Sequence, residues 1–171
     1  MKRDMLEKGQ IMASLEMLAR NLTAARQTGE MLLGEEAVMV LIVGSRSSLR
    51  TMAASFGQGA VAMRAAADEL VWKTGLPTNW LDGKFENIHD VVSSALLWRK
   101  YPGLEIYHPA LDYVLARKIV ANRYMDRVDA QALAQHLNMR SPKLIIQLLQ
   151  HSIPERDLTP HIQYQVEEWF G

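Results

Sequence analysis

One lysine of this chain, Lys118, lies inside the apolar stripe of a predicted helix. At about 100° per residue, Leu111, Val114, Leu115 and Asn122 share its face. A charge taken out of water is costly unless it is paired, so the pattern leaves two interpretations open. Either the apolar stem packs while the ammonium group reaches water, or the ammonium group faces a phosphate or carboxylate at the edge of a site.

Three charged residues follow this lysine. Asp126 is placed to cap a helix that we expect over Arg127–Leu137, because aspartate is a favoured N-cap residue. We interpret Arg123, Asp126 and Asp129 as helix caps and ion pairs at a helix junction, with a supporting role beside a site as the alternative.

A second group of candidates lies in a short polar segment after an apolar run. Hydroxyl and guanidinium groups gathered in one loop can hold an anion without a metal, because hydrogen bonds from a charged donor are stronger than those between neutral groups. A solvated loop is the alternative, and it is the preferred interpretation. The candidates are Gly44, Ser45, Arg46, Ser47 and Arg50.

The elements that must position these residues can be predicted from periodicity and from the end signals of helices. We expect helices over 6–26, 60–74, 91–98, 109–123 and 127–137, and two more that begin at Ser141-Pro142 and Pro160. Strands are expected over 37–43 and 104–107, a turn at 57–59 and an irregular connection over 76–83. The order predicts an α+β (mixed α/β) fold, with a core over 1–108 and a helical part over 109–171 packed on it.

Composition limits the class of protein. The chain has 171 residues, 19 Lys+Arg and 19 Asp+Glu, so its balanced charge does not favour a nucleic-acid-binding surface. It has no cysteine, which excludes disulfides and thiolate metal sites. The five histidines lack metal-ligand spacing. No apolar stretch has membrane-spanning length, so we expect a soluble, cytoplasmic protein.

Several short pieces, taken in order, resemble a family of bacterial nucleotidyltransferase-fold proteins that includes toxin-like members of abortive-infection systems. The resemblance covers roughly residues 37–170. The pieces are the run that ends in Gly44-Ser45, then Arg50-Thr51, Gly75-Leu-Pro-Thr-Asn-Trp-Leu-Asp82, Tyr107-His-Pro, and Leu115-Ala-Arg-Lys118 with Arg123, Asp126 and Asp129 after it.

The resemblance implies a small mixed sheet and a metal-dependent nucleotide site. In such proteins a glycine turn, here aligned with Gly44-Ser45, holds the triphosphate, and two aspartates bind Mg²⁺. The aspartate positions align with Ala53 and Ser55, and no Asp or Glu occurs between Glu36 and Asp68. Glu105 aligns with a third carboxylate, but one carboxylate alone binds Mg²⁺ poorly.

Three hypotheses follow. The first is a catalytically degenerate nucleotidyltransferase-like protein that binds a nucleotide, a nucleic acid or a protein. The second is an active Mg²⁺-dependent nucleotidyltransferase, toxin-like, in which Glu105 and carboxylates from Asp68 onward converge and Lys118 assists. The third is an assembly module that dimerises through the N-terminal helix. No cofactor is expected unless the second hypothesis holds.

Overall fold

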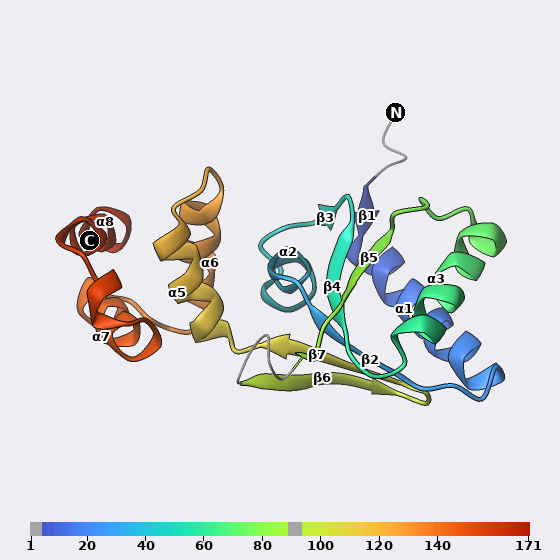
Figure 1. The fold of residues 1–171 in the computed structure, drawn as a ribbon. Coiled ribbons are helices and arrows are strands. Elements are labelled where there is room, and N and C mark those ends of the chain that lie inside the picture. The colour runs from blue at the N-terminus through green and yellow to red at the C-terminus, as the bar shows by residue number, and fades with distance from the viewer. Residues whose placement is uncertain (1–4, 89–93) are drawn as a thin grey trace. The chain divides into compact units, whose positions relative to one another are not determined.

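The structure, a computed structural model, describes residues 5–88 and 94–171. Contacts divide the chain into two compact units, residues 1–109 and 110–171. The fold is α+β, as the order of elements predicted: the first unit combines helices with a sheet, and the second is helical (Figure 1).

A mixed sheet organises the N-terminal unit. Its five strands among the described residues run in the order β5-β4-β2-β7-β6. The pairs β2–β7 and β4–β5 are parallel, whereas β2–β4 and β6–β7 are antiparallel. The strands are β2 (Gly29–Leu33), β4 (Met52–Phe56), β5 (Leu81–Phe85), β6 (Ala95–Tyr101) and β7 (Leu104–Pro109).

Two helices, α1 (Lys8–Ala24) and α3 (Ala60–Thr74), contact each other and the sheet. Side chains alternate between the faces of a strand, so one set of sheet residues forms the core with these helices. That set includes Met31, Leu33, Met52, Phe56 and Ile106. The alternate residues point to the opposite face, and many of them are polar. A short ladder of β1 (Leu6–Glu7) with β3 (Ser48–Leu49) lies beside this sheet.

Residues 110–171, all of which the structure describes, form four α-helices. They are α5 (Leu111–Ala121), α6 (Asp126–His136), α7 (Pro142–Ser152) and α8 (Pro160–Phe170), with a 3-10 turn, η2 (Glu155–Asp157), before the last. The predicted starts at Pro142 and Pro160 are confirmed. Ser141 and Thr159 cap these two helices by accepting the amides of Leu144 and Ile162.

The predicted strand over 37–43 is wrong. This segment is helical, with α2 (Glu35–Val38) followed by a π-helical stretch, η1 (Met39–Val43), that ends at Gly44 in the left-handed region (φ 74°). Residues 37–41 are all buried, so the run lacks the alternation of polar and apolar residues that distinguishes a helix from a strand. A short apolar run of this kind does not distinguish a buried strand from a buried helix.

Four further predictions in the N-terminal unit are corrected. The central strand β2 lies in a segment for which no strand was expected, and β5 begins inside the predicted irregular connection. Of the helix predicted over 91–98, residues 95–98 lie in strand β6, and residues 91–93 lie outside the described residues. Pro109 ends β7 instead of starting a helix.

The remaining element predictions agree more closely with the structure. Helices over 6–26 and 60–74 are confirmed as α1 and α3, and the strand over 104–107 as β7. In the part of the chain that the structure describes, no helix is both long enough and apolar enough to cross a membrane.

Candidate functional site

The polar face of the sheet gathers chemical groups from neighbouring strands. The register pairs Ser55 with Leu32 on one side and with Lys84 on the other, and pairs Leu32 with Tyr107. One step along the same face, two residues away on each strand, Glu30 pairs with Glu105. Directly paired residues point to the same side of a sheet, so these residues share the face opposite α1 and α3.

The two positions aligned with metal-binding aspartates lie on β4, on this polar face. Ala53 is exposed and pairs with Asp82 of β5. The hydroxyl of Ser55 donates a hydrogen bond to Oε2 of Glu86 at 2.9 Å. The two residues therefore offer a methyl group and a hydroxyl group that already has a carboxylate partner.

Glu105, the third aligned carboxylate, is bound by its neighbours on the same face. Lys100 lies 3.0 Å from Oε1, and the hydroxyl of Tyr107 donates to Oε2 at 2.9 Å. These hydrogen bonds, that from Lys100 foremost, hold the pKa of Glu105 below its ordinary value, although burial opposes them. The bond to Glu105 in turn raises the pKa of Tyr107. Glu105 is thus an ionised carboxylate with both oxygens engaged.

Glu30 adds a carboxylate that the sequence did not identify. Its Oε1 accepts the amide of Gln58 at 2.9 Å, which ties β2 to the turn after β4. Glu30, Glu86 and Tyr107 were all missed as members of a site. Alternation along β2 and β7 was the signal that could have found Glu30 and Tyr107, but β2 itself was not predicted.

A glycine turn that the sequence analysis did not identify lies at the end of β2. Gly34 joins β2 to α2, and its amide donates to the carbonyl of Ala53 at 2.9 Å. A Cβ at Gly34 would lie 2.8 Å from that carbonyl oxygen, so only glycine allows this approach. The next two residues, Glu35 and Glu36, suit a helix N-terminus, but their charge would repel a triphosphate.

The predicted anion loop after Gly44 follows a helix and not a strand, which corrects its assignment as a strand-end phosphate turn. The amides of Gly44 and Ser45 both donate to the carbonyl of Met39, which completes the end of η1. Arg46 lies 3.7 Å from Glu36. Ser47 and Arg50 are exposed. The amides of Gly44 and Ser45 are therefore engaged within the chain.

Lys118 lies in the helical unit and is 3% exposed. Its ammonium nitrogen is 2.9 Å from Asp129 and 3.3 Å from Asp126, both also buried. The interpretation in which its head reaches water is therefore wrong. The ammonium group faces carboxylates, as the other interpretation allowed, and both carboxylates are buried side chains of the same helical unit.

Arg123 and Asp126 complete this cluster at the α5–α6 junction. Oδ2 of Asp126 accepts both the amide and Nε of Arg123, at 2.8 and 3.1 Å. Asp126 is the first residue of α6 and binds backward to Arg123, so its predicted N-cap role is corrected. Burial alone would raise the pKa of Asp126, but the hydrogen bonds from Arg123 and Lys118 together lower it.

The residues at the aligned positions do not fit a Mg²⁺ ion. This hard cation requires oxygen ligands, with carboxylates to offset its dehydration, and Ala53 supplies none. Among residues 5–88 and 94–171, no group of three or more His, Asp or Glu side chains has the geometry to hold a metal. Asp68 lies on the exposed side of α3, which packs on the other face of the sheet from Glu105.

Comparison of the chain with protein-family models, with curated proteins and with solved structures found no match.

Proposed function

We propose that this chain is a nucleotidyltransferase-like protein that has lost metal-dependent catalysis and acts by binding. The observation that carries the proposal is the polar face of the sheet at β4. Ala53 and Ser55 stand where the resemblance places two metal-binding aspartates, and the hydroxyl of Ser55 is bonded to Glu86. Two-metal catalysis of nucleotide transfer requires carboxylates to hold the ions that stabilise the attacking and leaving oxygens.

The arrangement of strands supports the nucleotidyltransferase-like part of the proposal. A strand, β2, leads through a glycine turn at Gly34 into a helix, and the chain returns antiparallel along β4 beside β2. The third aligned carboxylate, Glu105, lies on the next strand on the other side, parallel to β2. Ala53, Ser55 and Glu105 therefore lie in one sheet, as the resemblance implies, whereas the segment before Gly44 is helical and not the implied strand.

The surviving polar groups support binding better than transfer. Glu105, Tyr107 and Lys100 form a fixed hydrogen-bonded row, and Glu30 is fixed to the next turn. Such a preorganised face can recognise a partner by hydrogen bonding without any change in its own bonds. The partner is a nucleotide, a nucleic acid or a protein, and homodimerisation through α1 is the assembly alternative.

A manganese titration with two matched proteins tests this proposal. Mn²⁺ broadens backbone NMR signals near its binding site, and it takes the oxygen ligands that Mg²⁺ takes. We expect no selective broadening of β4 in the natural chain and selective broadening at residues 52–56 in the double variant Ala53→Asp, Ser55→Asp. Selective, saturable broadening of β4 in the natural chain would overturn the loss of the metal site. Broadening of β4 in neither protein would argue against the alignment of Ala53 and Ser55 with metal-binding aspartates.

A further inference from the structure

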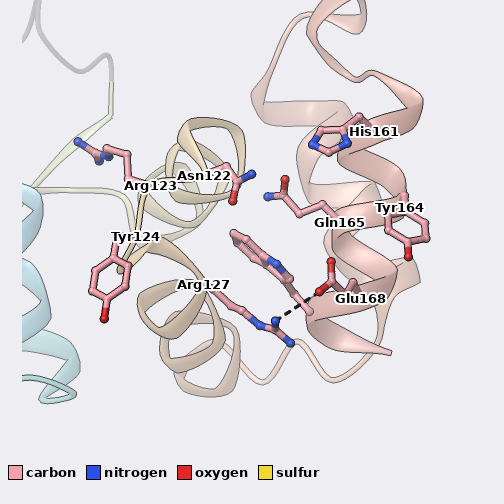
Figure 2. Close-up of a pocket in the computed structure, with 9 residues that line it drawn as sticks. Asn122, Arg123, Tyr124, Arg127, His161, Tyr164, Gln165 and Glu168 are labelled. Atoms are coloured by element: carbon pink, nitrogen blue, oxygen red, sulfur yellow. Dashed lines mark hydrogen bonds and ion pairs between the residues drawn. The ribbon is translucent and has the colours of Figure 1, made fainter.

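A pocket of about 390 Å³ lies within the helical unit, between α8 and the turn that joins α5 to α6. Its volume falls in the range of small-molecule sites, roughly 300–1,000 Å³. Figure 2 shows the side chains that line it: Asn122, Arg123, Tyr124, Arg127, His161, Tyr164, Gln165, Glu168 and Trp169. None of these residues belongs to the sheet face described above.

Two arginines and one carboxylate line this pocket. Arg123 is already paired with Asp126, so the charged pair of the lining is Arg127 with Glu168. Arg127 and Glu168 form the ion pair drawn in Figure 2, at 3.4 Å, and both side chains are about half exposed. An exposed pair at this distance is weak, so an incoming anion can replace Glu168 as the partner of Arg127. A phosphate group would do so well, because guanidinium groups bind it through two parallel hydrogen bonds.

The same pocket carries groups that suit a planar, hydrogen-bonding ring. The amide side chains of Asn122 and Gln165 point toward each other across it (Figure 2). Nε2 of Gln165 donates to the carbonyl of Ile119 at 2.7 Å, so this amide is held in place. Asparagine and glutamine amides pair with the edges of nucleobases. Tyr164, 70% exposed, offers a ring face on which a base can stack.

We propose that this pocket binds a mononucleotide. The phosphate replaces Glu168 on Arg127, and the base lies against Tyr164 with its edge on Asn122 and Gln165. Inorganic phosphate would use Arg127 alone, and a nucleoside would use only the two amides and the tyrosine ring. The proposal goes beyond the proposed function and does not depend on the state of the sheet face.

Calorimetric titration of the full chain with four probes tests the ligand class. The probes are AMP, adenosine, ribose 5-phosphate and a 5′-phosphorylated trinucleotide, all at low salt. We expect AMP to bind with one site per chain, and adenosine and ribose 5-phosphate to bind at least tenfold more weakly. If the trinucleotide binds more tightly than AMP, the source of the ligand is the 5′ end of a nucleic acid, and otherwise it is a free nucleotide. If AMP binds no better than its two halves, the proposal fails.

Variants of the two charged residues locate the site. Arg127→Gln should weaken AMP binding at least tenfold, whereas Glu168→Gln should strengthen it several-fold because the competing carboxylate is gone. Arg156→Gln is the matched control, since Arg156 is exposed in η2 and does not line the pocket. Thermal unfolding checks that each variant is folded. Equal AMP affinity of the Arg127 and Arg156 variants, or weaker binding by Glu168→Gln, would overturn the proposal.

Discussion

At the residue scale, Lys118 and its two aspartates form the most buried charged cluster that the structure describes in the helical unit. Lys118, Asp126 and Asp129 are each no more than 3% exposed. Their mutual attraction offsets the cost of taking three charges out of water only while all of them are present. The cluster also joins the end of α5 to the start of α6, because Asp126 accepts the amide of Arg123.

Removing the lysine charge should therefore destabilise the helical unit strongly. Lys118→Met keeps most of the apolar stem but removes the buried ammonium group that contacts both Asp126 and Asp129, while Asp126 keeps its bonds from Arg123, and we expect a loss of about 3–5 kcal/mol. Urea unfolding followed by circular dichroism measures it. The matched control is Lys143→Met on α7, where the lysine is exposed, and it should change stability by less than about 0.5 kcal/mol. Similar losses in both variants would contradict the structural role of Lys118.

The cluster also predicts a dependence of stability on pH. The pKa of Asp126 is lower in the folded chain than its ordinary value of 3.8. The contribution of Asp126 to the free energy of unfolding is therefore fully present above the pKa that this group has in the unfolded chain. The contribution is lost as pH falls from that pKa through the lower pKa of the folded chain. We expect the unfolding free energy to decrease below about pH 4, and to decrease less steeply in Asp126→Asn. Identical slopes for the two proteins would contradict this assignment.

The sequence predicted part of this cluster. The position of Lys118 in an apolar stripe indicated that it needs a partner, and Arg123, Asp126 and Asp129 were expected to form ion pairs at a junction. The sequence did not show that these aspartates are the partners of Lys118. Lys118 and Asp129 lie eleven positions apart on different helices, and only the way α6 packs on α5 brings them together.

At the scale of elements, prediction succeeded where local signals were strong. Helices α7 and α8 begin with a capping hydroxyl residue followed by proline, and both starts were placed correctly. Prediction failed for β2 and for the helical segment 35–43. Four of the five residues of β2 are buried, so the strand lacks the alternation that marks a half-exposed strand, and its neighbours β4 and β7 come from other parts of the chain. Such non-local pairing leaves no local pattern.

The β2–α2 turn gives a test at this scale. Gly34→Ala would place a methyl carbon against the backbone oxygen of Ala53, which cannot move without shifting β4. We expect a loss of about 1–3 kcal/mol, typical of overpacking. Gly9→Ala is the matched control, because nothing lies within 4 Å of its Cβ position in the first turn of α1. Replacing that helical glycine should stabilise the chain by up to about 1 kcal/mol. If Gly34→Ala is no less stable than the natural chain, the close approach at β4 is not supported.

At the scale of the whole molecule, the proposed function predicts how the chain behaves in solution. The apolar side of α1 is used within its own unit, where Ile11, Leu15, Leu18 and Leu22 are buried. The outer side of the helix carries the exposed Glu16–Arg20 ion pair. We therefore expect a monomer by light scattering across a wide concentration range. A stable dimer that Glu16→Leu or Arg20→Leu alters would favour the assembly hypothesis.

The measurement that most directly tests the central claim is nucleotide transfer by the purified natural chain. Each of the four radiolabelled nucleoside triphosphates would be incubated with the protein, a pool of RNAs and Mg²⁺ or Mn²⁺, with and without a chelator. We expect no label on RNA or protein above the chelated control, because Ala53 and Ser55 cannot hold the ions that the reaction requires. Transfer of label that the chelator abolishes, and that is lost in Glu105→Gln, would contradict it.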